Sequence, residues 1–153
     1  MPLSSTDKRD ALALFILRLG LIWFIALWAI HKVLTPAQYQ QLAKHFDKVD
    51  VSVAQVYAIA GAQLALCALA LLGIFRLFSY GGLAVMHAFT VSRRWDRFLD
   101  PFVINDRGFP INRNVVIDLA VMGAFIALVL LIHRDHASIG GWLRRHWEER
   151  WWL

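Results

Sequence analysis

The most informative hydrophobic pattern in this chain is an uncharged run from Val51 to Phe75. The run contains no Asp, Glu, Lys or Arg over 25 residues. Arg76 interrupts it, and a second apolar run begins at once with Leu77. A helix needs about 20 apolar residues to cross roughly 30 Å of hydrocarbon, and a soluble core helix is rarely so long and so free of charge. The pattern therefore predicts two membrane-spanning helices joined by a tight hairpin.

The same reading over the whole chain predicts an all-α membrane protein with four spans. The spans cover about residues 11–34, 52–75, 77–92 and 115–133. The third is short, and we expect its helix to continue through Arg93, Arg94 and Trp95, with the arginines reaching back to the headgroups. No segment has the ten-residue alternation of a membrane strand. The chain thus divides into a polar segment (1–10), a four-helix membrane domain (11–133) and a tail (134–153).

Residues between the spans predict a surface helix and helix caps. Thr35, Pro36 and Gln38 match a capping-box start, with Thr at the N-cap, Pro at N1 and Gln at N3. Apolar residues then follow at helical spacing beside lysines, which is typical of a short amphipathic helix on the membrane surface. Asn112 or Asn114 is expected to cap the fourth span.

Small residues recur four positions apart on three of the predicted spans. The repeats are Ala54, Ala58 and Ala62, then Ala84 and Ala88, and finally Ala120 and Ala124. Small faces let helix backbones approach closely in lipid. We therefore expect a compact four-helix bundle that packs through these faces.

The tail after Gly141 is rich in tryptophan and arginine. It contains Trp142, Leu143, Arg144, Arg145, Trp147, Trp151 and Trp152. Leu143, Trp147 and Trp151 are four apart and would form one apolar stripe. Because tryptophan favours the headgroup region, we favour an amphipathic helix that anchors at the interface. The alternative is a docking surface for another subunit, since exposed Trp and Arg are also common hot-spot residues.

Composition and charge narrow the function classes. The 153 residues are 59% hydrophobic and 18% charged, which is more apolar than a usual soluble domain. The formal charge is +5, but the basic residues lie at the ends of apolar runs and form no continuous stripe, so nucleic acid is not an expected partner. Cys67 is the only cysteine, which excludes dithiol redox chemistry within the chain. Lys and Arg are divided about evenly between the two sides of the membrane, so they do not set the orientation.

Folding the spans up and down brings several polar residues to the end of the bundle opposite the N-terminus. They are His31, Lys32, Gln55, His87 and Asp118. Ionisable groups in a membrane usually face an interior or a water-filled cavity, so a shared pocket with a Lys32–Asp118 ion pair is one hypothesis. Structural roles are the alternative: Lys32 can reach the headgroups, Asp118 can suit the helix dipole, and His87 can bond a backbone group.

Arg18 lies deeper in the first span than a boundary residue. It could bind a lipid phosphate or a partner carboxylate, although reaching back to the headgroups is the favoured explanation.

The tail also gathers four potential metal ligands: His133, Asp135, His136 and His146. No cysteine accompanies them, and no metal is expected. Haem ligation by His31 and His87 has equally little support.

Three stretches resemble the DoxX-like family of small four-span membrane proteins. Arg18-Leu-Gly-Leu and Trp28-Ala-Ile-His-Lys32 resemble that family's first span. Gly61-Ala-Gln-Leu-Ala-Leu-Cys-Ala-Leu-Ala-Leu-Leu-Gly73 followed by Ile-Phe-Arg76 resembles its hairpin, and residues 114–131 resemble its last span. Many relatives carry an acidic residue where this chain has Gln63, which cannot carry a proton. The resemblance covers about residues 11–133 and excludes the tail.

The resemblance implies a redox setting, because the family includes members linked to quinone-dependent thiosulfate oxidation and distant relatives that act as assembly chaperones. The chain itself carries no complete catalytic set. We therefore expect an accessory or assembly subunit of a larger membrane redox or respiratory complex, in contact with lipid and other subunits. Arg18, Arg144, Arg145 and the tail tryptophans are the docking candidates. The alternative is a quinone-interacting component that uses the polar pocket and Gln63. The expected location is the bacterial inner (cytoplasmic) membrane, with the N-terminus in the cytoplasm.

Overall fold

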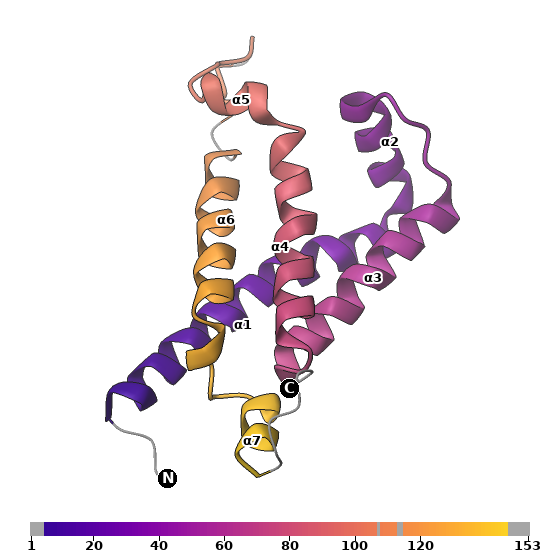
Figure 1. Ribbon diagram of the computed structural model, residues 1–153. Coiled ribbons are helices and arrows are strands. Elements are labelled where there is room, and N and C mark those ends of the chain that lie inside the picture. Colours follow the sequence, from indigo (N-terminus) through magenta and orange to yellow (C-terminus); the bar gives the residue numbers. More distant parts are fainter. Residues whose placement is uncertain (1–4, 107, 113–114, 147–153) are drawn as a thin grey trace.

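The computed structural model describes residues 5–106, 108–112 and 115–146, and over these ranges the chain is all-helical (Figure 1). Its seven described α-helices are α1 (Ser5–Leu34), α2 (Pro36–Asp47), α3 (Val53–Leu72), α4 (Arg76–Ser92), α5 (Trp95–Leu99), α6 (Val115–Leu130) and α7 (Ile139–His146). A short 3₁₀ helix, η1 (Ile132–Arg134), follows α6. The described residues contain an isolated β-bridge between Ile104 and Pro110 and no sheet. The predicted all-α class is confirmed.

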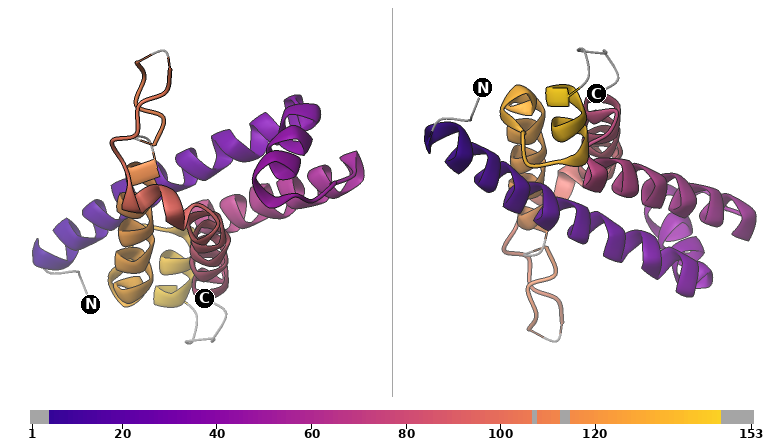
Figure 2. Two further views of the ribbon diagram at one scale, coloured as in Figure 1. Left: turned by 90° about the horizontal axis from the view of Figure 1, so that it is seen from above. Right: turned by 90° about the horizontal axis from the view of Figure 1, so that it is seen from below.

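The helices form two crossing pairs. α1 lies along α3, and α4 lies along α6, with the second pair packed across the first (Figures 1 and 2). The core lies where the pairs cross, and it includes Leu21 of α1, Cys67 of α3, Leu83 of α4 and Phe125 of α6. α7 and the start of α1 lie at one end of the molecule, whereas α2 and α5 lie at the other (Figure 1).

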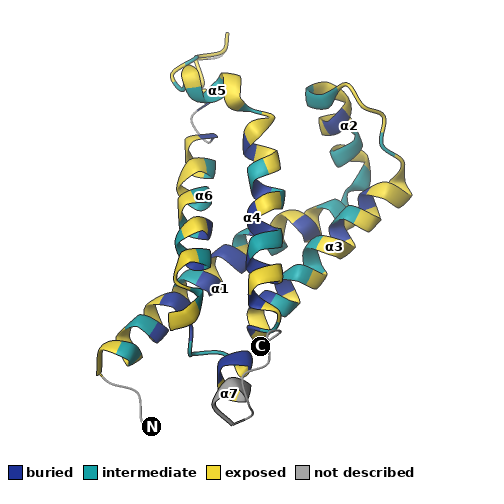
Figure 3. Ribbon diagram, in the orientation of Figure 1, coloured by how far each residue is buried: buried dark blue, intermediate teal, exposed yellow. Residues whose placement is uncertain are grey.

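Two helices in the described ranges are long and apolar enough to cross a membrane. They are α1, with 30 residues, and α3, with 20 residues, and they coincide with the first two predicted spans. α6 is also apolar but has 16 residues. α4 has 17 residues. Many apolar side chains on these helices face outward, so that yellow segments run along the outside of every long helix in Figure 3.

The predicted tight hairpin between the second and third spans is present as the turn from α3 to α4. Gly73 ends α3 in the left-handed region, with φ of 68°. Its N–H donates to the carbonyl of Ala70, and Ile74 N–H donates to the carbonyl of Leu69. Glycine suits this position because a side chain there would be strained and would collide with Ser138.

The predicted helix caps are partly wrong. Thr35 precedes α2 and Pro36 is its first residue, but the Thr35 side chain makes no capping hydrogen bond. Its hydroxyl donates instead to the carbonyl of His31, at 2.8 Å, because α1 ends immediately before it. The capping box occurs at the start of α3, where Ser52 and Gln55 bond each other's backbone N–H.

Asn112 is one of the two predicted caps of the fourth span, and its side-chain amide binds the preceding loop. The Asn112 side chain donates to the carbonyl of Asp100, at 2.9 Å, and so connects the two ends of the preceding loop. Asn114, the other predicted cap, lies outside the described residues.

The predicted packing face of the second span is also wrong. Ala54, Ala58 and Ala62 are exposed, whereas Val56 and Ala60 are buried. α3 turns this other face to α1 because that face also carries a polar contact to α1, described below. The alanine repeats on the third and fourth predicted spans are more buried than this one. Ala84 is buried and Ala88 half-buried on α4, and on α6 Ala124 is half-buried and Ala120 exposed.

The third span does not continue through the arginines as expected. α4 ends at Ser92, and α5 begins a separate short helix at Trp95. The break lets Arg93 pair with Asp47 of α2 and Arg94 approach Asp118 of α6. Partners on neighbouring helices therefore decide where this helix ends.

In the tail, helix α7 is described from residue 139 to residue 146. The indole of Trp142 is about half exposed. Trp147 and Trp151 lie outside the described residues, and the side chains of Arg144 and Arg145 are likewise not described. The predicted apolar stripe therefore remains a prediction.

Candidate functional site

The most distinctive polar feature is a buried ion pair between Arg18 of α1 and Asp135, which follows η1. The Arg18 Nη1 atom lies 2.8 Å from Asp135 Oδ2, and their side chains are 1% and 0% exposed. The Tyr80 hydroxyl donates to the same carboxylate oxygen at 2.6 Å, and it accepts from Arg18 Nη1 at 3.2 Å. Three helical segments distant in sequence thus meet at one charged group.

A second buried arginine fixes the backbone of the same segment. Arg76, the first residue of α4, donates to the carbonyl of Asp135 at 2.7 Å and to that of Ile132 at 3.0 Å. Arg18 adds a hydrogen bond from Nη2 to the carbonyl of Ala137 at 2.7 Å. These bonds satisfy carbonyls that follow the end of α6, among which that of Ile132 also accepts from Asp135 N–H.

The fixed segment in turn positions α7. Gly140, in the first turn of α7, packs so closely on the α3–α4 turn that a Cβ atom there would collide with the carbonyl of Gly73. The Ser138 hydroxyl accepts from Gly141 N–H at 2.9 Å and helps to start the helix. The charged cluster therefore connects the long helices to the tail. We call Arg18, Arg76, Tyr80 and Asp135 the tail clamp.

The tail clamp is closed rather than open to a ligand. Burying one charge without a partner is costly, but a paired and hydrogen-bonded charge can be accommodated. Each guanidinium here has acceptors, although the buried Arg18 Nε atom has none among the described residues. Arg18 thus meets a carboxylate of its own chain, and neither a lipid phosphate nor the headgroup region is needed to explain it. This corrects the favoured explanation from the sequence.

Lys32 and Gln63, two of the predicted pocket residues, do meet. Lys32 Nζ donates to Gln63 Oε1 at 2.9 Å, which joins α1 to α3 near their α2 ends. The ammonium also lies 5.2 Å from the centre of the Tyr39 ring on α2. A desolvated cation is stabilised by such a ring face and by the amide oxygen.

His87 and Asp118 form a separate group between α4 and α6. His87 Nε2 lies 2.9 Å from the backbone carbonyl of Asp118, and the imidazole is buried between Phe24 and Phe125. The Asp118 carboxylate is 3.6 Å from Arg94. The predicted Lys32–Asp118 pair is therefore replaced by two different partnerships.

The last two predicted pocket residues point away from any shared cavity. His31 is exposed and interacts with Thr35 and with the Trp28 ring. Gln55 is exposed and belongs to the capping box of α3. Four of the six predicted residues thus meet in two separate contacts, Lys32–Gln63 and His87–Asp118. The other two, His31 and Gln55, interact with residues near them in sequence.

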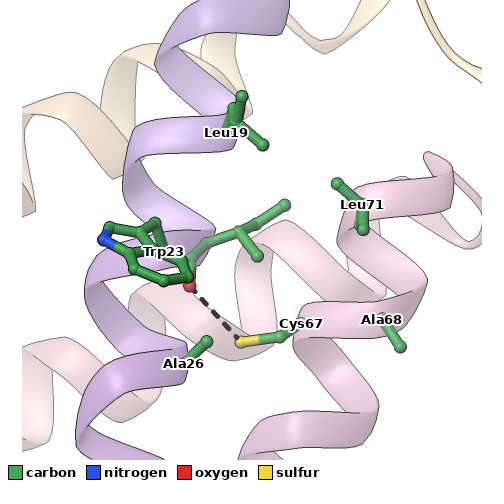
Figure 4. Close-up of a pocket in the computed structure, with 7 residues that line it drawn as sticks. Leu19, Trp23, Ala26, Cys67, Ala68 and Leu71 are labelled. Atoms are coloured by element: carbon green, nitrogen blue, oxygen red, sulfur yellow. Dashed lines mark hydrogen bonds between the residues drawn. The ribbon is translucent and has the colours of Figure 1, made fainter.

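The structure also contains an apolar groove between α1 and α3, shown in Figure 4. It has a volume of about 270 Å³ and is lined by Leu19, Ile22, Trp23, Ala26, Cys67, Ala68 and Leu71. The Cys67 thiol is directed at the carbonyl of Ile22, at 4.0 Å (Figure 4). Gln63 is one helical turn before Cys67, so the groove runs toward the Lys32–Gln63 pair.

Sequence reasoning missed Tyr80 and Arg76 and considered Asp135 only as a metal ligand. One signal was available, because a charge as deep as Arg18 requires a carboxylate at the same end of the bundle. Asp10 and Asp135 were the nearest candidates at that end, and Asp10 pairs with the exposed Arg134 instead, at 3.0 Å. Among the described residues, no cluster of three or more His, Cys, Asp or Glu side chains could hold a metal.

Comparison of the chain with protein-family models, with curated proteins and with solved structures found no match.

Proposed function

We propose that the chain is an integral membrane accessory subunit, with α1, α3, α4 and α6 embedded in the bilayer as a four-helix bundle. The length and apolar character of α1 and α3 support this placement. So do the outward-facing apolar side chains, such as Trp23 of α1, which is 63% exposed. In lipid these side chains have a favourable solvent, whereas in water they would form large aggregation-prone patches.

α4 and α6 are shorter than a typical span, and the proposal accommodates their length. A helix of 16 residues is roughly 24 Å long, somewhat less than the hydrocarbon thickness. Local thinning of the bilayer costs only fractions of a kcal/mol per Å of mismatch. The residues beyond α6 also return to the bundle through the tail clamp.

The single observation that carries the accessory role is the tail clamp. Its charges are used to fix the segment before α7, and the Arg18 and Asp135 side chains are 1% and 0% exposed. The fold thus holds the start of the Trp- and Arg-rich tail, with the half-exposed Trp142, at one defined place on the bundle. A surface of that composition suits binding to another membrane subunit. A membrane redox or respiratory complex is the setting that the DoxX-like resemblance suggests.

The test is purification of the tagged protein from its native membrane in a mild detergent. We expect stoichiometric protein partners to co-purify with the full chain and to be lost when residues 147–153 are deleted. Trp95→Ala is the matched control, because it removes an exposed tryptophan at the opposite end of the molecule. Alkaline carbonate extraction of each variant reports membrane residence separately. A full-length protein that purifies alone contradicts the accessory role, and partners that survive the deletion contradict the role of the tail.

A second candidate function, binding of a quinone, is favoured by the groove between α1 and α3. In this proposal the apolar tail of the quinone lies in the groove, and the Lys32 ammonium, which lies beyond the residues that line the groove, donates to a quinone carbonyl. Extraction of the purified protein with organic solvent would detect the bound quinone. We expect Lys32→Ala to lose it, whereas Lys44→Ala, on the exposed surface of α2, should not. Equal retention by the two variants would exclude this site.

A further inference from the structure

Three arginines gather at the end of the molecule opposite the tail, and two of them lie over one aromatic ring. Arg93 and Arg94 follow the last turn of α4, and Arg97 lies on α5. The Arg97 Cζ atom is 4.5 Å from the centre of the Phe46 ring of α2, and the Arg94 Cζ atom is 5.8 Å from it. The ring thus holds two guanidinium groups in fixed positions near each other, as expected for Arg–aromatic stacking.

The acidic residues in contact with this cluster do not balance it. Arg93 pairs with Asp47, and Arg94 lies 3.6 Å from the carboxylate of Asp118. Arg97 makes no ion pair in the part of the chain that the structure describes. Three guanidinium groups therefore contact two carboxylates, and the unpaired one is Arg97.

The surroundings of the cluster are those of a membrane interface. The last turn of α4 carries Phe89 and Val91 beside Thr90 and Ser92, so in the proposed placement the cluster lies where that helix leaves the hydrocarbon. Beside it, Trp95 is 58% exposed and Leu99 is 74% exposed. Exposed tryptophan next to arginine is typical of the headgroup level, where a guanidinium meets phosphate and apolar side chains meet acyl chains.

We infer that Arg94 and Arg97, held over Phe46, bind the phosphate of an anionic phospholipid headgroup. The planar guanidinium offers paired N–H donors that match phosphate oxygens. The headgroup supplies the negative charge that the cluster lacks, and the acyl chains extend along the exposed apolar side chains of α5. The inference rests on the membrane placement proposed above but is independent of the accessory role, because lipid binding needs no protein partner.

The test is native mass spectrometry of the purified full chain after incubation with equal amounts of phosphatidylglycerol and phosphatidylcholine. We expect the wild-type protein to retain phosphatidylglycerol preferentially. Arg97→Gln should weaken this retention about fivefold, and Arg94→Gln with Arg97→Gln about 25-fold, from the usual contribution of one arginine near an anionic headgroup. Lys44→Gln is the matched control, since it removes one positive charge from α2 without touching Phe46. It should leave retention unchanged.

Each of the other outcomes overturns the inference. Equal retention of the two lipids by the wild-type protein, or equal losses in Arg97→Gln and Lys44→Gln, would show only general charge attraction. Displacement of phosphatidylglycerol by the same concentration of inorganic phosphate would indicate a site for the free anion. Loss of a co-purifying protein instead of lipid would assign the cluster to a protein interface. Circular dichroism checks folding, and if Arg97→Gln does not fold, Arg97→Lys replaces it, with partial retention expected.

Discussion

Asp135→Asn should strongly destabilise the protein, because it leaves a buried arginine without its counter-charge. The wild-type carboxylate accepts hydrogen bonds from Arg18 and Tyr80 with no exposure to solvent. Breaking a buried ion pair by removing one partner typically costs about 3–5 kcal/mol. The asparagine oxygen can still accept one hydrogen bond, so we expect a cost near the lower limit, about 3 kcal/mol. For a chain of this size, that corresponds to a fall of roughly 6–12 °C in Tm.

The measurement is thermal unfolding of the detergent-solubilised variants. Arg134→Gln is the matched control, because this neighbouring residue also pairs with α1, through Asp10, but its side chain is 65% exposed. An exposed pair contributes about 0–1 kcal/mol, so the control should melt close to wild type. Replacing the buried ion pair and its tyrosine by Arg18→Met, Tyr80→Phe and Asp135→Leu together should recover most of the loss, since neither charge of the pair remains and Arg76 keeps its backbone acceptors. If Asp135→Asn melts like Arg134→Gln, the ion pair does not support the fold.

Three further predictions follow from single contacts. Gly140→Ala should lower Tm and increase proteolysis of the tail while leaving the four long helices protected, because the added methyl group collides with the backbone turn that ends α3. Ser52→Ala should cost about 1 kcal/mol in thermal or denaturant unfolding, whereas Thr35→Ala, whose hydroxyl does not cap α2, should cost less. Gln63→Leu should cost about 1–2 kcal/mol by leaving the part-buried Lys32 without its side-chain acceptor. Adding Lys32→Met should restore the melting temperature, and failure to do so would refute that pairing.

The long helices could be predicted because their signal is local. The uncharged run from Val51 to Phe75 contains α3 and its sharp turn, and Gly73 marks the position where only a residue tolerant of positive φ fits. Helix ends were less predictable. Thr35 and Ser52 both precede plausible capping boxes, but only Ser52 caps, since the hydroxyl of Thr35 is already bonded to the end of α1.

Contacts between distant segments explain the errors at the site. His87 contacts a backbone carbonyl, as its structural alternative predicts, whereas Lys32 bonds Gln63 rather than the predicted partner Asp118. The choice depends on which faces of the helices meet. The exposed position of Ala58 shows that small size alone does not select the packing face of α3.

The sequence by itself determined the helical class and two candidate spans, because hydrophobic patterning acts within each segment. It also placed Arg18 deep in an apolar helix, with a partner carboxylate as one of the alternatives. Only the tertiary structure decided that this partner is Asp135, more than a hundred residues away, with Tyr80 completing the group. The physical reason is that charge neutralisation depends on distances of a few ångströms between segments whose spacing along the chain carries no such information.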